Sequence, residues 1–436
     1  MLRAIWRTAK RVPGVEKAYL KFRYRQYLES LRSKSAVGNG PNILIINHHF
    51  DQDIEALVQG CSEKCRFFVV DCMPFFNQAF LFFRTDAERD GIIPYPLLPP
   101  SVVRRYRNVA RGLFEDLYAI FPFDAVVAPS DSFWWLREFF EVVKENGRAR
   151  IVLDKEGTIS PYSYEIHSKQ IREKFPFMSD YLLVWSKRQR EFWIKSGVPP
   201  ECIRVLGQPR SDFFFESKRW RSRKELGLRD DRKVILFFTF DLDAYINLFP
   251  VEQVRHDSLS WLPLRNDINE VLIEYAKTHK TVDIVIKTHP QQSDINEIRE
   301  IFRNAGLENI LLMEGAYVSN HLIVNADLIV GFQTTALTEA MLTNKPVIYT
   351  GWSTTEKKVR EHLIPFQICK GLQIAESKKH FAEILHSWTS GAGVGGDVAS
   401  RKEFTDHWLN ADGEVCDRVA EALIDIVNRT KVQSLV

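Results

Sequence analysis

Short apolar runs that end in polar residues recur along the whole chain and predict the strands of parallel sheets. In the first half they lie at residues 42–46, 65–71, 124–129, 148–154, 181–186 and 203–207. In the second half they lie at residues 234–240, 282–288, 309–314, 326–331 and 345–350. Runs that are apolar at nearly every position are typical of strands buried on both faces.

Helical periodicity fills the intervals between these runs. Helices are predicted near residues 101–120, 133–146, 264–279, 294–305, 318–325 and 335–343. Alternating strands and helices are typical of a parallel sheet that helices cover on both faces. A basic, polar stretch at residues 216–233 separates the two series. The pattern therefore predicts an α/β protein with two doubly wound halves, whose strand ends face one central cleft.

The chain length of 436 residues suits two or three domains. We expect a basic segment at 1–35, a first Rossmann-like domain at 36–207, a second at 208–412 and a final helix at 413–436. The periodicity of this final helix does not decide whether it closes the second half or returns to the first half.

Composition sets the class of protein and its compartment. A hydrophobic content of 45% and an aromatic content of 12% exclude a disordered chain. Six scattered cysteines do not form a disulfide framework, and Cys61 and Cys65 lack the second ligand pair of a zinc site. No run approaches the roughly 20 apolar residues that a membrane-spanning helix needs. We expect a reduced, cytoplasmic protein.

Residues 1–35 are far more basic than the rest of the chain. They contain ten Lys or Arg and two Glu, interleaved with aromatic residues, whereas the whole chain has a formal net charge of +3. The segment lacks the uninterrupted apolar core of a signal peptide. It fits an amphipathic helix on the inner face of an anionic membrane, or a basic helix packed on the domain with a solvated face. No nucleic-acid-binding module follows it, so we expect no nucleic-acid partner.

Polar residues follow several strands of the first half. His48, His49 and Asp51 come after the first strand, where they suit a polar loop that contacts an acceptor, or helix capping by Asp51 or Asp53. Adjacent histidines seldom chelate one ion, so a metal is not expected there.

Asp154, Lys155 and Glu156 follow the strand at 148–154, and Gly157 permits a tight turn. The two carboxylates are candidates for a general base or for stabilising a cationic centre. The other interpretation is a solvated loop in which Lys155 pairs with a carboxylate.

Two further strand ends carry charged groups. Gln208 and Arg210 follow the strand at 203–207, where the guanidinium suits a phosphate or carboxylate, or a structural pair with Asp212. Asp241 and Asp243 end the strand that opens the second half, as candidate cation ligands or catalytic carboxylates.

Lys287, His289 and Pro290 end the strand at 282–288. Residues two apart on an extended chain point to the same side, so Lys287 offers a positive charge and His289 a donor to one ligand. The alternative is a strand end with a solvated lysine and a satisfied histidine.

A hydroxyl-rich turn follows the strand at 326–331. Gln333, Thr334 and Thr335 lead into a helix that carries Glu339. Free N–H groups and hydroxyls at a helix start suit an anion, and Glu339 suits a ribose. Ordinary capping by Thr334 or Thr335 is compatible with this role.

The order of these motifs resembles the carboxyl-terminal half of GT-B glycosyltransferases of bacterial surface-polysaccharide synthesis. The stretches are Gly207-Gln-Pro-Arg-Ser-Asp212, Lys287-Thr-His-Pro290, Ala326 through Thr335, and Asn344-Lys-Pro-Val-Ile348. The closest patterns are those of CDP-glycerol glycerophosphotransferases and of the CMP-sugar users that transfer sialic acid or Kdo. The resemblance covers residues 150–430 and implies a GT-B fold.

The resemblance to CMP-sialic acid transferases implies roles for individual residues. His289 and Pro290 match a His-Pro motif that contacts CMP, and Thr334-Thr335 resembles a hydroxyl pair that binds its phosphate. Asp154-Lys-Glu156-Gly resembles an acidic motif that supplies the catalytic base, with Glu156 favoured. Kdo transferases of similar fold use a carboxylate nucleophile, a role that Asp241 or Asp243 suits.

The leading hypothesis is a metal-independent glycosyltransferase without a cofactor, which moves a nonulosonic acid from a CMP-activated donor to a glycan or glycolipid acceptor. The alternatives are a CDP-glycerol-type phosphotransferase, a UDP- or GDP-sugar transferase, a nucleotide-sugar epimerase, or a non-enzymatic polysaccharide-binding protein.

Overall fold

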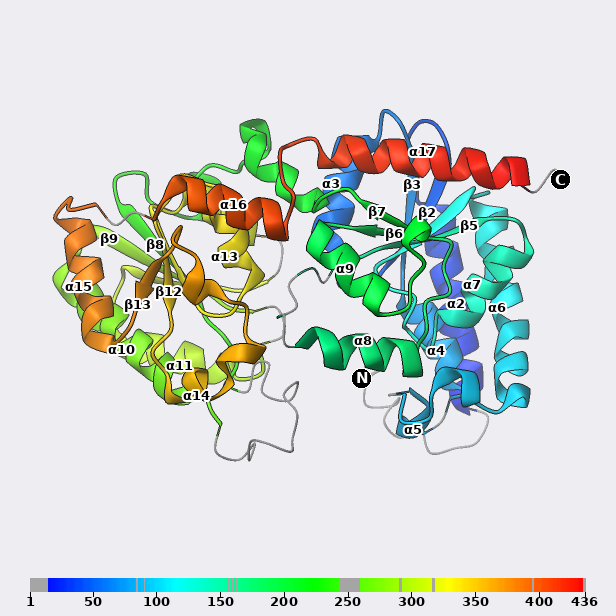
Figure 1. Ribbon diagram of the computed structural model, residues 1–436, viewed down its shortest axis with the longest axis horizontal. Coiled ribbons are helices and arrows are strands. Elements are labelled where there is room, and N and C mark those ends of the chain that lie inside the picture. The colour runs from blue at the N-terminus through cyan, green and yellow to red at the C-terminus, as the bar shows by residue number, and fades with distance from the viewer. Residues whose placement is uncertain are drawn as a thin grey trace. The chain divides into compact units, whose positions relative to one another are not determined.

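Each apolar run predicted as a strand is a strand in the computed structural model of the protein (Figure 1). The structure describes residues 15–83, 85–89, 91–155, 157, 160, 163–242, 259–289, 292–315, 318–393 and 396–433. The predicted fold class is confirmed, because two Rossmann-like sheets lie in succession along the chain.

The chain divides into two units. Unit 1 comprises residues 1–157, 165–210 and 414–436, and unit 2 comprises residues 158–164 and 211–413. The boundary between residues 210 and 211 lies three residues beyond the predicted boundary between residues 207 and 208. The last helix belongs to unit 1, which answers the question that its periodicity left open.

Unit 1 contains a seven-stranded sheet in the order β1-β3-β2-β4-β5-β6-β7. All its neighbouring strands are parallel except β1, which is antiparallel to β3. The strands are β1 (Val37–Gly38), β2 (Asn42–Asn47), β3 (Arg66–Asp71), β4 (Ala125–Ala128), β5 (Ala149–Leu153), β6 (Tyr181–Val184) and β7 (Ile203–Val205).

Both faces of this sheet are covered, which explains the unbroken apolar runs. Along β2, Leu44 and Ile46 enter one core and Ile43 and Ile45 enter the other. Figure 1 shows α17 along the sheet of unit 1. The helices of this unit are α2 (Val15–Arg32), α3 (Asp51–Cys61), α4 (Met73–Phe80), α5 (Asp86–Arg89), α6 (Pro100–Ile120), α7 (Arg137–Glu145), α8 (Ser163–Lys174, whose first two residues belong to unit 2), α9 (Lys187–Lys195) and α17 (Val415–Gln433).

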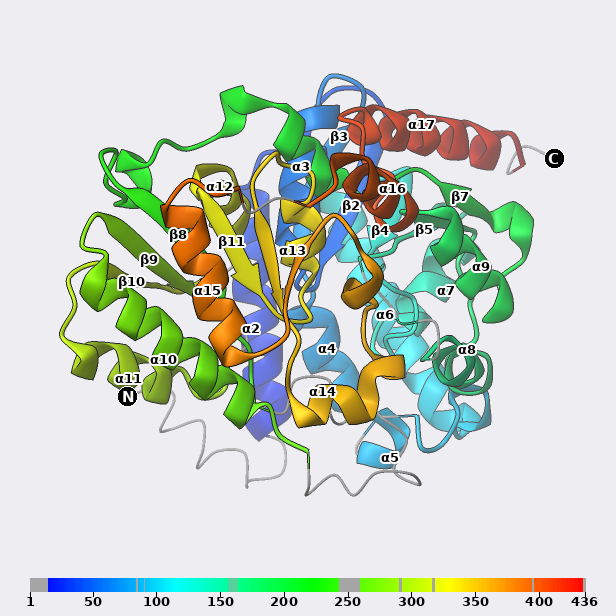
Figure 2. The same cartoon turned by 60° about the vertical axis from the view of Figure 1, so that its left-hand side comes forward.

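Unit 2 contains a six-stranded parallel sheet in the order β10-β9-β8-β11-β12-β13, and Figure 2 labels four of its strands, β8 to β11. Its strands are β8 (Lys233–Phe238), β9 (Val282–Lys287), β10 (Ile310–Met313), β11 (Leu328–Gly331), β12 (Val347–Thr350) and β13 (Gln373–Ala375). Its helices are α10 (Leu262–Thr278), α11 (Ile295–Ala305), α12 (Ser319–Asn325), α13 (Thr335–Ala340), α14 (Thr354–Val359), α15 (Lys378–Thr389) and α16 (Val398–Trp408).

Polar residues fix where several helices begin. Ser186, Ser377 and Asp397 each accept a hydrogen bond from a backbone N–H in the first turn of α9, α15 and α16. Such caps satisfy donors that have no partner within the helix. They set the direction in which each helix leaves its strand.

The basic amino-terminal segment is helical over residues 15–32. Leu20, Leu28 and Leu31 are buried in unit 1, whereas Lys21 and Arg25 are exposed. For these residues the structure shows a basic helix packed on the domain with a solvated face. Among the described residues, no helix is both long and apolar enough to cross a bilayer.

Candidate functional site

The strand order of each sheet reverses direction at its first parallel strand. In unit 2, β8 lies between β9 and β11, and in unit 1, β2 lies between β3 and β4. Loops that leave such a reversal point in opposite directions open a crevice at the carboxyl ends of the strands, where ligands bind in this class of fold. The predicted site residues follow the strands at and beside these two points.

Lys287 ends β9 as a buried lysine, only 1% exposed. Its Nζ donates a hydrogen bond of 2.6 Å to the carbonyl of Thr288. Burial lowers the pKa of Lys287 to about 8. No carboxylate among the described residues forms an ion pair with this ammonium, so an anionic ligand would supply the missing counter-charge.

His289 lies two residues on and is exposed. The loop that carries it is fixed at its base, because the N–H of Thr288 donates to the carbonyl of Met313 and the N–H of Gln292 donates to the carbonyl of His289. Lys287 and His289 thus differ in environment, one enclosed and one open to solvent. Pro290 lies outside the described residues.

Asp241, at the end of β8, holds the loop that follows β9. Its Oδ1 accepts hydrogen bonds from the backbone N–H of Ser293 at 2.9 Å, from the Ser293 hydroxyl at 2.8 Å and from the Gln292 amide at 3.2 Å. This geometry gives Asp241 a positioning role toward the loop of His289. Its predicted role as a nucleophile remains a prediction, and Asp243 lies outside the described residues.

A buried arginine strengthens the same junction. Arg265 of α10 is fully buried, and its guanidinium donates to Oδ2 of Asp294 at 2.5 Å and to the carbonyl of Phe240 at 3.3 Å. Asp294 in turn accepts from the Gln292 amide at 2.7 Å. Arg265 was not predicted as a site residue, because a single arginine in an amphipathic helix resembles any solvated residue.

The turn after β11 is built around Gln333, whose φ is +32°. Its amide donates to the Tyr349 hydroxyl at 2.9 Å and to the carbonyl of Ile364 at 3.0 Å, and its Oε1 accepts from the N–H of Ile364 at 2.8 Å. All of these partners belong to the protein. The geometry therefore argues against the predicted donor contact through this side chain.

Thr334 caps α13 and accepts a hydrogen bond from the N–H of Ala336 at 3.3 Å. Thr334 and Thr335 are both half-buried, and Glu339 is buried on the same helix. The capping interpretation is confirmed for Thr334. The phosphate contacts of the threonines and the ribose contact of Glu339 remain predictions.

In unit 1, His48 lies at the reversal point between β2 and β4. Its Nδ1 is 3.2 Å from the sulfur of Cys72, and its ring packs edge-on against Phe133 and Trp135. Burial, followed by the charge of Lys155, lowers the pKa of His48 to about 4. His48 is therefore neutral at pH 7.

Its neighbour His49 is exposed and has a φ of +52°. A non-glycine residue in this region of backbone space is uncommon and often marks a functional loop. Asp51 does not cap α3 through its side chain but accepts from the Asn47 amide at 2.7 Å. The acceptor contacts predicted for this loop remain predictions.

The ammonium of Lys155 contacts the loop that follows β2, and the predicted pairing of Lys155 with a carboxylate remains a prediction. Its Nζ donates to the carbonyls of His48 at 3.3 Å and His49 at 3.5 Å, and so ties the ends of β5 and β2 together.

Asp154 is buried, and its Oδ2 accepts from the Gln189 amide at 2.7 Å and from the Trp193 indole at 2.5 Å. These contacts describe a structural carboxylate rather than an open base. The favoured alternative, Glu156, lies outside the described residues. Gly157 beside it packs directly on Trp185, because a Cβ there would lie 2.0 Å from a ring carbon.

Arg210 does not pair with Asp212. Its guanidinium donates to Oδ2 of Asp53 at 2.8 Å and lies 5.1 Å from the ring centroid of Trp185. The residue joins the start of α3 to the segment after β7, next to the buried Gln208. A guanidinium that already contacts a carboxylate and an aromatic ring has a structural role, which weakens the prediction that Arg210 binds the donor.

Asp53 and Trp185 were not identified as partners of this region. Asp53 was considered only as a helix cap, and its carboxylate instead meets an arginine that is 157 residues away in the sequence. Among the described residues, no group of three or more His, Cys, Asp or Glu side chains is arranged to hold a metal ion.

Solved structures of similar fold cover almost the whole chain. They include UDP-GlcNAc 2-epimerase from Neisseria meningitidis bound to UDP-GlcNAc, with 14% identity over 89% of this chain and 100% of that chain and a TM-score of 0.53. A putative UDP-N-acetylglucosamine 2-epimerase from Listeria monocytogenes has 14% identity over 88% of this chain and 96% of that chain, with a TM-score of 0.53. At these identities the likeness shows the fold alone.

No curated protein matches the sequence. A family model described as CDP-glycerol:poly(glycerophosphate) glycerophosphotransferase matches residues 149–425, from the start of β5 to the middle of α17. This stretch is more than half of the chain and contains the ends of β5, β7, β8, β9 and β11. The likeness to CMP-Kdo and CMP-sialic acid transferases has no such support. The protein belongs to the CDP-glycerol:poly(glycerophosphate) glycerophosphotransferase family.

Proposed function

We propose that the protein transfers an alditol phosphate from a CDP-alditol, such as CDP-glycerol, to a hydroxyl group of a polyol-phosphate or glycan acceptor. The observation that carries the proposal is the family match over residues 149–425, which contains Lys287 and His289. The match favours this alternative over CMP-nonulosonic acid transfer. Both donors release CMP, so the motifs that suggested a CMP clamp fit either reaction.

The reaction is a displacement at phosphorus. The acceptor oxygen forms a bond to the β-phosphorus of the donor, and the bond from that phosphorus to the bridging oxygen breaks. CMP leaves with the electron pair, and the acceptor proton passes to a base. Negative charge therefore grows on the leaving phosphate, where fixed donors stabilise the transition state most.

Lys287 and His289 are suited to this charge. The buried ammonium of Lys287 lacks a counter-ion among the described residues, and its electrostatic effect is large because it lies in a medium of low dielectric constant. The exposed imidazole of His289 is two residues away at the same strand end and can donate to a phosphate oxygen. The hydroxyl of Thr335, at the start of α13, is the third proposed contact.

On the acceptor side, we propose that Glu156 is the base that takes the proton of the acceptor hydroxyl. Gly157 on the Trp185 ring and Lys155 on the carbonyls of His48 and His49 hold the flanks of its loop. We propose that neither metal nor cofactor takes part, because Lys287 and His289 supply the positive charge that a cation would otherwise provide.

We also propose peripheral contact with the cytoplasmic face of an anionic membrane. Lys21, Arg23 and Arg25 of α2 are exposed, and Phe22 between them is 56% exposed. Basic residues that flank an exposed aromatic ring favour an anionic lipid surface. Cosedimentation with phosphatidylglycerol vesicles, but not with phosphatidylcholine vesicles, is the expected result. A triple Lys21→Gln, Arg23→Gln, Arg25→Gln variant should lose it.

The proposed activity is tested by CMP release. Release from CDP-glycerol that depends on a poly(glycerophosphate) or polyol-phosphate acceptor supports it. Release from CMP-Kdo or CMP-sialic acid alone would instead support the nonulosonic acid hypothesis. Interconversion of UDP-GlcNAc without an acceptor would support an epimerase. Each donor is tested with wild-type protein and with His289→Ala, so that background hydrolysis is subtracted.

A further inference from the structure

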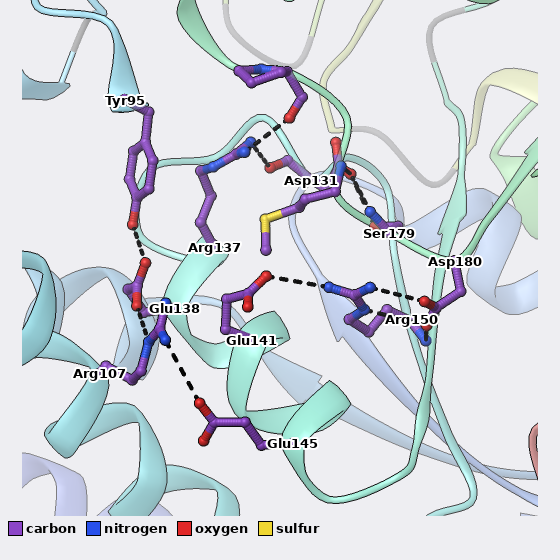
Figure 3. A network of polar contacts seen from close by, with 12 residues as sticks. Tyr95, Arg107, Asp131, Arg137, Glu138, Glu141, Glu145, Arg150, Ser179 and Asp180 are labelled. Atoms are coloured by element: carbon purple, nitrogen blue, oxygen red, sulfur yellow. Dashed lines mark hydrogen bonds and ion pairs between the residues drawn. The ribbon is translucent and has the colours of Figure 1, made fainter. Parts of the chain in front are cut away.

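A pocket lies in unit 1, between the start of α6, the start of α7 and the segment that precedes α6. Its volume is about 310 Å³, and Val103 is part of its lining. The lining also includes five residues that Figure 3 labels, which are Tyr95, Arg107, Arg137, Glu138 and Glu141. None of these residues follows the reversal point of a sheet or was identified from the sequence. The family model begins at residue 149, after all six of them.

Glu138 forms one wall and is fully engaged. It is 2% exposed, and its Oε1 accepts from the Tyr95 hydroxyl at 2.7 Å while its Oε2 accepts from the Arg107 guanidinium at 2.6 Å. Because both carboxylate oxygens of Glu138 already accept hydrogen bonds from the protein, this side chain forms a rigid wall of the pocket. The hydrogen bonds fix the positions of Tyr95 and Arg107.

Arg137 forms a second wall and has an unused donor. It is 5% exposed, and two of its nitrogens donate to the carbonyls of Asp131 at 3.0 Å and Pro176 at 2.8 Å. Its third nitrogen, Nε, is buried and has no hydrogen-bond acceptor. Buried donors without an acceptor are rare in native proteins and call for an explanation.

Glu141, one turn along α7, has an unused acceptor. Its Oε1 accepts from Arg150 at 3.3 Å, and Arg150 is otherwise held by Asp180 at 2.8 Å. Within the described part of the chain, Oε2 of Glu141 accepts no hydrogen bond, and this side chain is 32% exposed. The walls of the pocket therefore contain one enclosed donor without an acceptor, Nε of Arg137, and one partly exposed acceptor without a donor, Oε2 of Glu141.

The charged side chains of the walls restrict the chemistry of an occupant. An anion would meet the carboxylates of Glu138 and Glu141, and a cation would meet the guanidinium groups of Arg107 and Arg137. A hydroxyl group donates a hydrogen bond to the partly exposed Oε2 of Glu141 without adding charge. The ring of Tyr95 and the side chain of Val103 add apolar surface for the C–H faces of a ligand.

We infer that this pocket binds a neutral sugar residue. Most pockets for small ligands combine apolar walls with a few placed polar groups, and a volume near 310 Å³ is at the small end of their range. If the proposed phosphotransfer is correct, the sugar belongs to the acceptor, and the pocket is a subsite that holds it away from the reacting hydroxyl.

Binding is tested by titrating the full chain with chitotriose, maltotriose and mannotriose in an NMR saturation-transfer experiment. At least one trisaccharide should bind to wild-type protein. Val103→Trp fills the pocket without a change in charge and should weaken that binding at least tenfold. Asn108→Trp places the same side chain on the exposed surface of α6 and should bind like wild type.

Three results would overturn the inference. They are no binding of any of the three trisaccharides, equal binding by Val103→Trp and wild type, or tighter binding of a sialylated trisaccharide than of its neutral counterpart. Circular dichroism of Val103→Trp confirms that loss of binding is not loss of fold. CMP release from CDP-glycerol is measured in parallel, because sugar binding without that release refutes the proposed function and leaves the pocket assignment in place.

Discussion

The guanidinium of Arg210 lies 2.8 Å from the carboxylate of Asp53, a contact that joins the segment after β7 to the start of α3. The Asp53 side chain is 3% exposed and the Arg210 side chain 12% exposed. Loss of one partner from such an enclosed pair leaves a charge without compensation. This contact, rather than the expected Arg210–Asp212 pair, fixes the geometry of the GQPRSD stretch.

We predict that Asp53→Asn lowers the free energy of unfolding by about 3 kcal/mol, measured by urea denaturation. The matched control is Asp425→Asn, which removes the partner of Arg204 from the exposed surface of α17. Because water screens that pair, its loss should lower the free energy of unfolding far less than Asp53→Asn does. Equal losses in the two variants would contradict the assigned role of Asp53.

Lys287 should make nucleotide binding depend on pH. Burial lowers its pKa to about 8, so its ammonium is charged below that pH and neutral above it. The affinity for CMP and CDP-glycerol should therefore fall as the pH rises through about 8. Isothermal titration over this range should show the fall in wild type and a flat profile in Lys287→Met.

The lowered pKa of Lys287 affects stability in the opposite direction. Nucleotide affinity should fall as the pH rises, whereas the free energy of unfolding should rise. The folded state binds the lysine proton less tightly than the unfolded state, whose pKa is near the ordinary value of 10.5. The unfolded state holds more protons between these two values, so the contribution of Lys287 to the free energy of unfolding rises with pH across them. Lys287→Met should remove this rise, and a rise that persists in the variant would exclude Lys287 as its source.

His289→Ala should reduce CMP release by about 100-fold or more while the fold survives, because loss of one transition-state donor has an effect of this size. His407→Ala removes an exposed histidine from α16 of the same unit and should retain activity. Glu156→Gln should also abolish transfer. Near-normal turnover in both His289→Ala and Glu156→Gln would refute the assignment of these residues.

Gly157→Ala should disturb the loop next to Glu156. The added Cβ would lie 2.0 Å from a ring carbon of Trp185, which is fully buried and cannot move freely. We expect a large loss of CMP release together with a lower melting temperature. Gly112→Ala on α6 is the control, because nothing lies within 4 Å of its new methyl group and alanine favours a helix. A Gly157→Ala protein with wild-type turnover would show that the loop does not need this close packing.

Gln333→Met should affect stability more than ligand binding. The change leaves the N–H and carbonyl of Ile364 and the Tyr349 hydroxyl without their Gln333 partner, at a cost of about 1–3 kcal/mol. The affinity for nucleotide should stay within about twofold of wild type, whereas Thr335→Val should weaken it. A large loss of nucleotide affinity in Gln333→Met would restore Gln333 to the donor site.

The strands could be predicted because both faces of each sheet are buried. Alternation of Leu44 and Ile46 on one face with Ile43 and Ile45 on the other gives an unbroken apolar run that needs no tertiary information. The two-residue β1 and the three-residue β13 were missed, whereas β7, also of three residues, was predicted within the run at 203–207. Helices α4, α5, α8, α9, α14, α15 and α16 were likewise not predicted, although the caps Ser186, Ser377 and Asp397 mark three of their starts. Helix α3 was considered only as the helix that Asp51 or Asp53 would cap.

The site residues likewise divide into those that could be located from the sequence and those whose environment depends on the folded structure. Motif order located the strand ends that carry Lys287, His289 and Thr334, because strand position along the chain is local information. It did not find the partner of Arg210, which depends on how α3 lies against the segment after β7. Nor did it distinguish the enclosed amide of Gln333 from an open one, because side-chain environment is a property of the folded structure.

The position of α17 has a consequence for the order in which the protein matures on the ribosome. Val415, Val419 and Leu423 complete the core that covers one face of the β1–β7 sheet, although most of that sheet is synthesised before residue 210. Unit 2, which ends at residue 413, is fully synthesised before this cover emerges. The amino-terminal half of the nascent chain therefore waits with an apolar face uncovered while the later half folds, a period in which a chaperone is needed most.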